Sequence, residues 1–172
     1  MMQCLMQDPI AMAERMMHEH QLPSSIDLKE ELLSPECGME KIERLQSIMF
    51  KMPQETRLET SHYFVPGMYC RKLYRPAGTV IVGKVHKKSH FFMCASGELI
   101  VIHEGGTRTL KAGDVIECQP GTKRVTFAVV DSVGITIHKT DKTCLDDIEE
   151  ELIEHDERAL FDSGNNLKNI LE

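Results

Sequence analysis

The feature that most constrains the fold is residues 62–140, where short β-prone runs alternate with turn residues. We expect strands at 63–65, 69–74, 79–85, 91–94, 98–103, 108–110, 114–119, 124–130 and 135–138. Glycine, Pro-Gly and Asp-Ser turns separate these runs, and no helical periodicity intervenes. Even spacing of short strands predicts an antiparallel sandwich or barrel, so the fold class is mainly β.

Helical patterns flank this zone and predict three regions: an N-terminal helical extension over 1–61, the barrel over 62–140 and an acidic helix with a tail over 141–172. Asp8-Pro9 and Ser34-Pro35 are typical helix starts, and a short helix is expected over 27–33. The helix after Ser34 has an apolar face made of Met39, Ile42, Leu45 and Met49. The C-terminal helix has a stripe made of Leu145, Ile148 and Leu152.

The net charge of −7 is unevenly distributed. Residues 62–140 carry +6, whereas 1–61 carry −5 and 141–172 carry −8. The acid excess excludes a general binder of long nucleic acid, which needs a basic surface. A positive zone inside an acidic chain is instead compatible with binding a small anion.

The location of the chain is predicted from what the sequence lacks. No run of about 18 apolar residues could span a membrane, and the first 20 residues lack the pattern of a signal peptide. The six cysteines include no CxxC motif, which favours free thiols in a reducing compartment. We therefore expect a cytoplasmic protein without membrane contact.

Two segments carry the candidate chemistry, GKVHKKSH at 83–90 and GDVIECQPGTKR at 113–124. Their glycines, proline and histidines resemble the two motifs of the cupin superfamily, which implies a jelly-roll β-barrel. His86 matches the first histidine of the cupin HxH element, His90 the glutamate position and Gly97 the turn glycine. The second motif is matched by Gly113-Asp114 and by 120–122.

The ligand positions of the cupin motifs are changed in this chain. Lys88 replaces the second histidine and Arg124 replaces the histidine of the second motif. Neither cation is a ready metal ligand, although His86 and His90, helped by His138, could still hold a divalent metal. Strand alternation is expected to bring His86, Lys88 and His90 to one face. The predicted anion-binding set is Lys84, His86, Lys88, His90, Lys123, Arg124 and His138.

A closer resemblance is to a family of cupin-like proteins of tailed bacteriophages. It is carried by His90 and by the segments PGMY, PAGT, GKVHK, PGTKRV and TIHKT, at 66–69, 76–79, 83–87, 120–125 and 136–140. The resemblance implies a viral context, in which the host cell cytoplasm is the expected location.

Three functional hypotheses follow. The first is a module that captures an anionic small molecule of phosphate or nucleotide type without turnover, for example in phage counter-defence. The second is a metal-dependent cupin enzyme, a dioxygenase or isomerase, that uses His86 and His90. The third is an interaction protein whose acidic helices inhibit a host protein, through a run at 146–151. The replaced ligand positions favour a non-enzymatic role.

Self-association is also expected. Exposed sheet edges and an amphipathic N-terminal segment both favour pairing, so we predict a homodimer or higher homo-oligomer.

Overall fold

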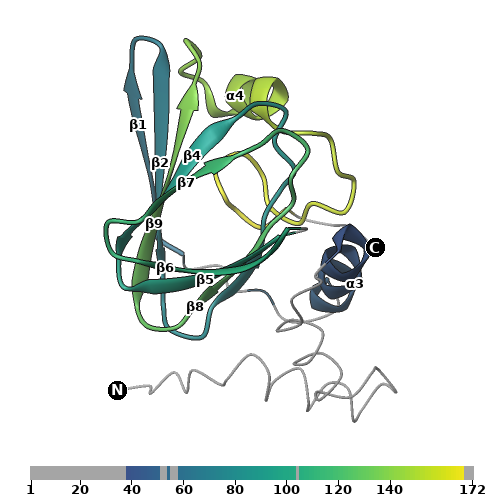
Figure 1. The fold of residues 1–172 in the computed structure, drawn as a ribbon. Helices are drawn as coiled ribbons and strands as arrows, with labels where there is room; N and C mark the ends of the chain where they lie inside the picture. The colour runs from purple at the N-terminus through teal and green to yellow at the C-terminus, as the bar shows by residue number, and fades with distance from the viewer. Residues whose placement is uncertain (1–37, 51–53, 55–57, 104, 169–172) are drawn as a thin grey trace, which may run out of the picture.

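The computed structural model describes residues 38–50, 54, 58–103 and 105–168, and shows two antiparallel sheets that face each other (Figure 1). The five-stranded sheet has the order β1 (Thr60–Val65), β2 (Met68–Arg75), β9 (Ser132–Lys139), β4 (His90–Ser96) and β7 (Val115–Cys118). The four-stranded sheet has the order β3 (Val80–Val82), β8 (Val125–Ala128), β5 (Glu98–His103) and β6 (Gly106–Lys111). The chain passes repeatedly from one sheet to the other, which confirms the predicted jelly-roll barrel.

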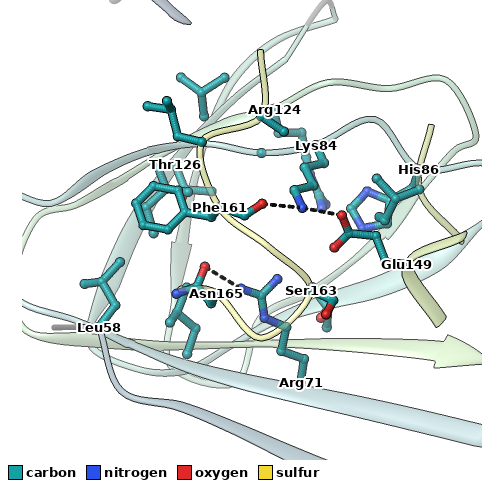
Figure 2. Close-up of a pocket in the computed structure, with 18 of the residues that line it drawn as sticks. Leu58, Arg71, Lys84, His86, Arg124, Thr126, Glu149, Phe161, Ser163 and Asn165 are labelled. Carbon is teal, nitrogen blue, oxygen red and sulfur yellow. Dashed lines mark hydrogen bonds and ion pairs between the residues drawn. The ribbon is translucent and has the colours of Figure 1, made fainter. Parts of the chain in front are cut away.

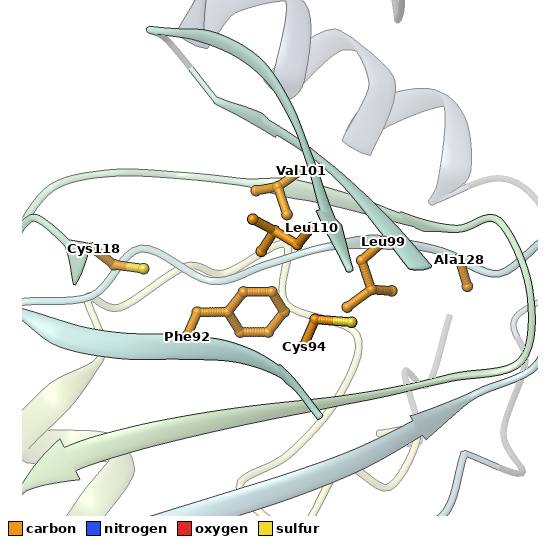
Figure 3. Packing of buried hydrophobic residues seen from close by; sticks show 7 residues of the cluster. All are labelled: Phe92, Cys94, Leu99, Val101, Leu110, Cys118 and Ala128. Atoms are coloured by element: carbon orange, nitrogen blue, oxygen red, sulfur yellow. The ribbon is translucent and has the colours of Figure 1, made fainter. Parts of the chain in front are cut away.

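The core between the sheets follows from the alternation of side chains along each strand. Phe92 and Cys94 point inward from β4, and Leu99 and Val101 point inward from β5 (Figure 3). Leu110, Cys118 and Ala128 complete this cluster. The apolar core fills one part of the barrel and leaves polar side chains to line the remainder.

Helix α3 (Met39–Met49) covers the outer face of the four-stranded sheet. Its buried residues Ile42, Leu45 and Ile48 pack on Ile102 and Val125. The predicted apolar face is confirmed for Ile42 and Leu45, with Met49 at its margin, whereas Met39 is not part of this cluster and Ile48, which was not predicted, is buried in it. The expected helices after Pro9 and over 27–33 lie outside the described residues.

Helix α4 (Leu145–Leu152) lies across one end of the barrel (Figure 1). Ile148 and Leu152 pack against Tyr69 of β2, so the predicted stripe is buried. No helix among the described residues is long and apolar enough to cross a membrane.

Turn geometry explains one of the glycines singled out in the sequence. Gly97 has a φ of +77°, and a Cβ there would collide with the Asp131 carbonyl and with Ser132. Only glycine combines this conformation with such a close approach between the β4–β5 turn and the start of β9. The four described cysteines, Cys70, Cys94, Cys118 and Cys144, are free thiols.

The packing of α3 leads to a stability prediction. Ile42 is 1% exposed, so we expect Ile42→Ala to lower the free energy of unfolding by about 2–4 kcal/mol. Ser47→Ala, on the exposed side of the same helix, should change it by less than about 0.5 kcal/mol. Chemical denaturation of the full chain measures both, and equal effects would contradict the packing described.

Candidate functional site

Three histidines converge inside the barrel. His90 begins β4, His138 lies near the end of β9, and His86 lies in the connection between β3 and β4, where it bridges to Ile153. The ring centroids of His86 and His90 are 4.0 Å apart, and that of His138 lies 5.2 Å and 4.6 Å from them. One ring nitrogen from each residue can be chosen so that all three lie within 4.8 Å of one another.

The interior holds these imidazoles in their neutral form. Burial, together with the neighbouring histidines and arginines, lowers the pKa of His86 to about 2. Burial and Arg124 lower the pKa of His90 to about 4, and burial, His90 and Arg124 lower that of His138 to about 3. Neutral imidazoles retain a lone pair, so the cluster can accept hydrogen bonds or ligate a metal.

Arg124 connects this cluster to the core. Its Nη2 donates a hydrogen bond to His90 Nε2 at 2.9 Å, and its Nη1 donates to the Cys118 thiol. Its guanidinium also lies over the Phe92 ring, 5.1 Å from the centroid. His90 Nδ1 donates to the Lys88 carbonyl at 3.3 Å, so the Nε2 that faces Arg124 is the acceptor.

Two further arginines project into the barrel from β2. Arg75 is buried, and its guanidinium also lies over the Phe92 ring, 5.7 Å from the centroid. Arg71 lies four residues before Arg75 in β2, so its side chain is on the same face of the sheet. Its Nη2 donates a hydrogen bond to Asn165 Oδ1 at 2.9 Å. The Nε atoms of both arginines are buried and have no hydrogen-bond partner among the described residues. Burial and the mutual repulsion of the three arginines lower the pKa of Arg75 to about 10.

Gly134 of β9 makes room for Arg75. A Cβ at this position would collide with Arg75 Nη1 and lie 3.0 Å from the Phe92 ring. The missing side chain therefore leaves the space that the guanidinium occupies beside Phe92.

The three arginines, His86 and His138 line part of a cavity of about 270 Å³ that extends from the barrel interior to the C-terminal end of α3. The residues 153–168, which we call the C-terminal strap, close part of it (Figure 2). Lys84 Nζ donates to Glu149 Oε1 at 2.8 Å and to the Phe161 carbonyl at 3.0 Å. Together with the bond from Arg71 to Asn165, these contacts attach the strap and α4 to the basic wall of the barrel.

The structure brings most of the sequence-predicted site residues together. Four of them line the cavity: Lys84, His86, Arg124 and His138. His90 contacts the rings of His86 and His138 and the guanidinium of Arg124. Lys88 and Lys123 lie elsewhere.

Two local causes explain these exceptions. The expected strand alternation at 86–90 is wrong because residues 87 and 88 form a bend. The side chain of Lys88 is consequently half exposed and pairs with Glu151. Lys123 is two residues before Val125, so its side chain points to the same outer face of the sheet, beneath α3. There it is 1% exposed, contacts Gln46 and lies 3.6 Å from Asp156.

Arg71 and Arg75 were not predicted from the sequence. In β2 the inward residues Tyr69, Arg71, Leu73 and Arg75 alternate with Met68, Cys70, Lys72 and Tyr74. Both sets mix apolar and basic residues, so alternation could not show which set faces the cavity. The sequence feature that could have indicated them is a pair of arginines four residues apart in one strand, which places both side chains on one face of the sheet.

Comparison of the sequence with protein families and with curated proteins finds no match. Solved structures of similar fold include a cupin superfamily protein from Desulfitobacterium hafniense, with 11% identity, a TM-score of 0.45, and coverage of 56% of this chain and 88% of that one. KdgF from Halomonas sp. has 19% identity and a TM-score of 0.46, with 55% and 88% covered. Salicylate 1,2-dioxygenase from Pseudoaminobacter salicylatoxidans has 14% identity and a TM-score of 0.48, with 66% and 33% covered. At these identities and scores the likenesses carry no conclusion about ligand or activity.

The neutral histidines predict a loss of stability in acid. The unfolded chain binds protons below about pH 6.5, whereas the buried imidazoles resist protonation until far lower pH. The free energy of unfolding should therefore fall between pH 6.5 and 4, by up to about 1.4 kcal/mol per pH unit for each histidine.

A matched pair of variants assigns this slope. His138→Asn should flatten it, whereas His155→Gln, which removes an exposed histidine, should leave it unchanged. Denaturant titrations at several pH values measure the slope, and an identical slope in His138→Asn and the unaltered chain would contradict the assignment.

Proposed function

We propose that the protein binds a small anionic molecule in the barrel cavity. The observation that carries this proposal is the placement of Arg71, Arg75 and Arg124 on the cavity wall. Within the described part of the chain, no carboxylate lies within 4.0 Å of any of their nitrogens. Lys84 differs because Glu149 already neutralises it.

Uncompensated cations in a protein interior are unfavourable, because burial removes their hydration. An anion between the guanidiniums would restore part of that lost stabilisation. Carboxylate and phosphate oxygens match the planar fork of arginine and can accept two parallel bonds from it. The unpartnered Nε atoms of Arg71 and Arg75 are donors that such a ligand could satisfy.

The more specific form of the proposal is a phosphorylated ligand of nucleotide type. The +6 charge of residues 62–140 supports it, and the cavity volume suits a small molecule. Given the resemblance to tailed-phage proteins, the expected role is sequestration of a nucleotide signal as a counter-defence, without turnover.

A second candidate function is favoured by the three converging histidines. His86 Nδ1 and His138 Nδ1 are buried, and no group in the part of the chain that the structure describes forms a hydrogen bond with either atom. Neutral imidazoles are good ligands for divalent transition metals. His86, His90 and His138 would hold the metal, which would supply a Lewis-acidic centre for an enzyme of dioxygenase or isomerase type. Arg124 would have to release His90 Nε2, and would then be free to orient an anionic substrate.

The interaction hypothesis is less favoured by the contacts of the acidic run. Glu149 pairs with Lys84 and Glu151 pairs with Lys88, so these two carboxylates are bound within the molecule.

The anion proposal is tested by calorimetric titration of the full chain with inorganic phosphate, a dicarboxylate, and linear and cyclic nucleotides. Arg124→Gln should weaken binding of the anion that binds the unaltered protein by about 10- to 100-fold, because it removes a charged hydrogen-bond donor. Lys88→Gln is the matched control and should bind normally, since Lys88 points away from the cavity. Absence of heat from every anion, with the protein folded, would contradict the proposal.

A companion variant leaves all charges in place. Gly134→Ala should displace the flexible end of Arg75 and weaken anion binding while the barrel stays folded. Unchanged affinity in Gly134→Ala would show that the position of Arg75 is not used for the ligand.

The metal candidate is tested on protein purified without a histidine tag. If the cluster is a metal site, elemental analysis should find about one divalent metal per chain, and His138→Ala should reduce this at least tenfold. His155→Ala is the control. Clearly substoichiometric metal after reconstitution would contradict this candidate and leave the anion proposal intact.

A further inference from the structure

The end of the C-terminal strap is attached to the protein differently from its beginning. The beginning belongs to the barrel wall, because Ile153 forms a β-bridge with His86. Residues 159–168, which we call the strap tip, form a small hairpin of their own, in which Phe161 bridges to Leu167. In the part of the chain that the structure describes, no backbone–backbone hydrogen bond joins the strap tip to a helix or strand. Side chains therefore hold the strap tip in place.

The strap tip spans the opening between the two sheets. On one side, Arg71 of β2 donates to Asn165 Oδ1 at 2.9 Å, and Asn165 Nδ2 donates to Thr60 Oγ1 of β1 at 3.3 Å. On the other side, Lys84, which follows β3, donates to the Phe161 carbonyl at 3.0 Å. β1 and β3 are edge strands of their sheets, so the strap tip covers one side of the cavity between them (Figure 2). Two cations of the cavity wall are thus its anchors.

The contact between Asn165 and Arg71 satisfies a donor without neutralising a charge. The Asn165 amide is uncharged, and Arg71 Nε has no hydrogen-bond partner within the described ranges. Asn165 also has a φ of +66°, which no other non-glycine residue among those described shares with a positive value. Asparagine and aspartate tolerate this left-handed conformation better than other residues with a Cβ. The backbone therefore presents the amide oxygen to Arg71 at the position that an oxygen of an anion could take.

Given the anion-binding function proposed for the cavity, on which this inference rests, we propose that the strap tip is a gate that opens when the anion displaces Asn165 from Arg71. A hydrogen bond to an ionised acceptor is about twice as strong as one between neutral groups, so the anion outcompetes the amide. The anion can also accept from Nη2 and Nε together, whereas Asn165 uses Nη2 alone. The bond from Ser163 Oγ to Asp146 Oδ1 keeps the released strap tip beside α4.

Two substitutions of Asn165 test the gate in opposite directions. Asn165→Gly permits the same backbone conformation and removes the amide. We expect anions to associate with it about 3- to 10-fold faster and to bind correspondingly more tightly, because a larger fraction of the chain is open. Asn165→Asp gives Arg71 a carboxylate partner, so anion affinity should fall about tenfold or more. His155→Gln, at an exposed position of the same strap, is the control and should behave as the unaltered chain.

Binding is measured on the full chain by calorimetry and stopped-flow mixing with inorganic phosphate, a dicarboxylate, and linear and cyclic nucleotides. Hydrogen exchange, followed by mass spectrometry, monitors the gate without any ligand. Asn165→Gly should speed exchange of residues 159–168 about threefold or more and leave β5 unchanged. A saturating anion should speed exchange of the same residues in the unaltered chain, since it releases the strap tip.

The outcomes separate the gate from the anion-binding function. Unchanged exchange of the strap tip in Asn165→Gly would overturn the gate and leave anion binding intact, and so would equal affinity and association rate in the two chains. An anion that slows exchange of the strap tip would also overturn the gate. Absence of binding to both chains would contradict the anion-binding function and the gate together. Binding to Asn165→Gly alone would support both. Circular dichroism confirms that each variant is folded.

Discussion

Two buried guanidinium groups that lie over one phenylalanine ring give the barrel cavity its positive charge. Arg75 and Arg124 both lie over Phe92, from opposite sheets, and within the described residues neither has a carboxylate partner. Stacking on the ring and hydrogen bonds to Cys118, His90 and a carbonyl hold them in place. These contacts fix geometry but leave the charge uncompensated, which is why the cavity is suited to an anion.

The rest of the fold supports that arrangement. The apolar cluster around Leu99 and Val101 fixes the spacing of the two sheets, and Gly134 leaves the space that Arg75 fills. The C-terminal strap closes part of the cavity, and Glu149 of α4 neutralises Lys84, so the arginines carry the remaining positive charge. Arg124 helps to keep the three histidines neutral, together with Arg71 in the case of His86 and His138, and this leaves metal binding open as a second use of the site.

Turn residues made the barrel predictable from the sequence. The positive-φ glycines punctuate the chain, and nine strands form close to their expected positions. His86, His90, Arg124 and His138 were also accessible, since motif spacing and strand position indicate them. Lys88 was predicted to face the cavity but does not, because the chain bends before β4. Lys123 was predicted to face it as well, but its side chain points outward and is buried beneath α3. Arg71 and Arg75 could not be assigned because the two faces of β2 have the same mixture of residue types.

The central claim is that these arginines bind an anion, and a crystal structure of the full chain grown with the best-binding anion of the titration tests it most directly. We expect an oxyanion within hydrogen-bond distance of the Arg75 and Arg124 guanidiniums, next to His138. The opposite result is a cavity that contains only water, or one in which a carboxylate of the chain itself neutralises both arginines.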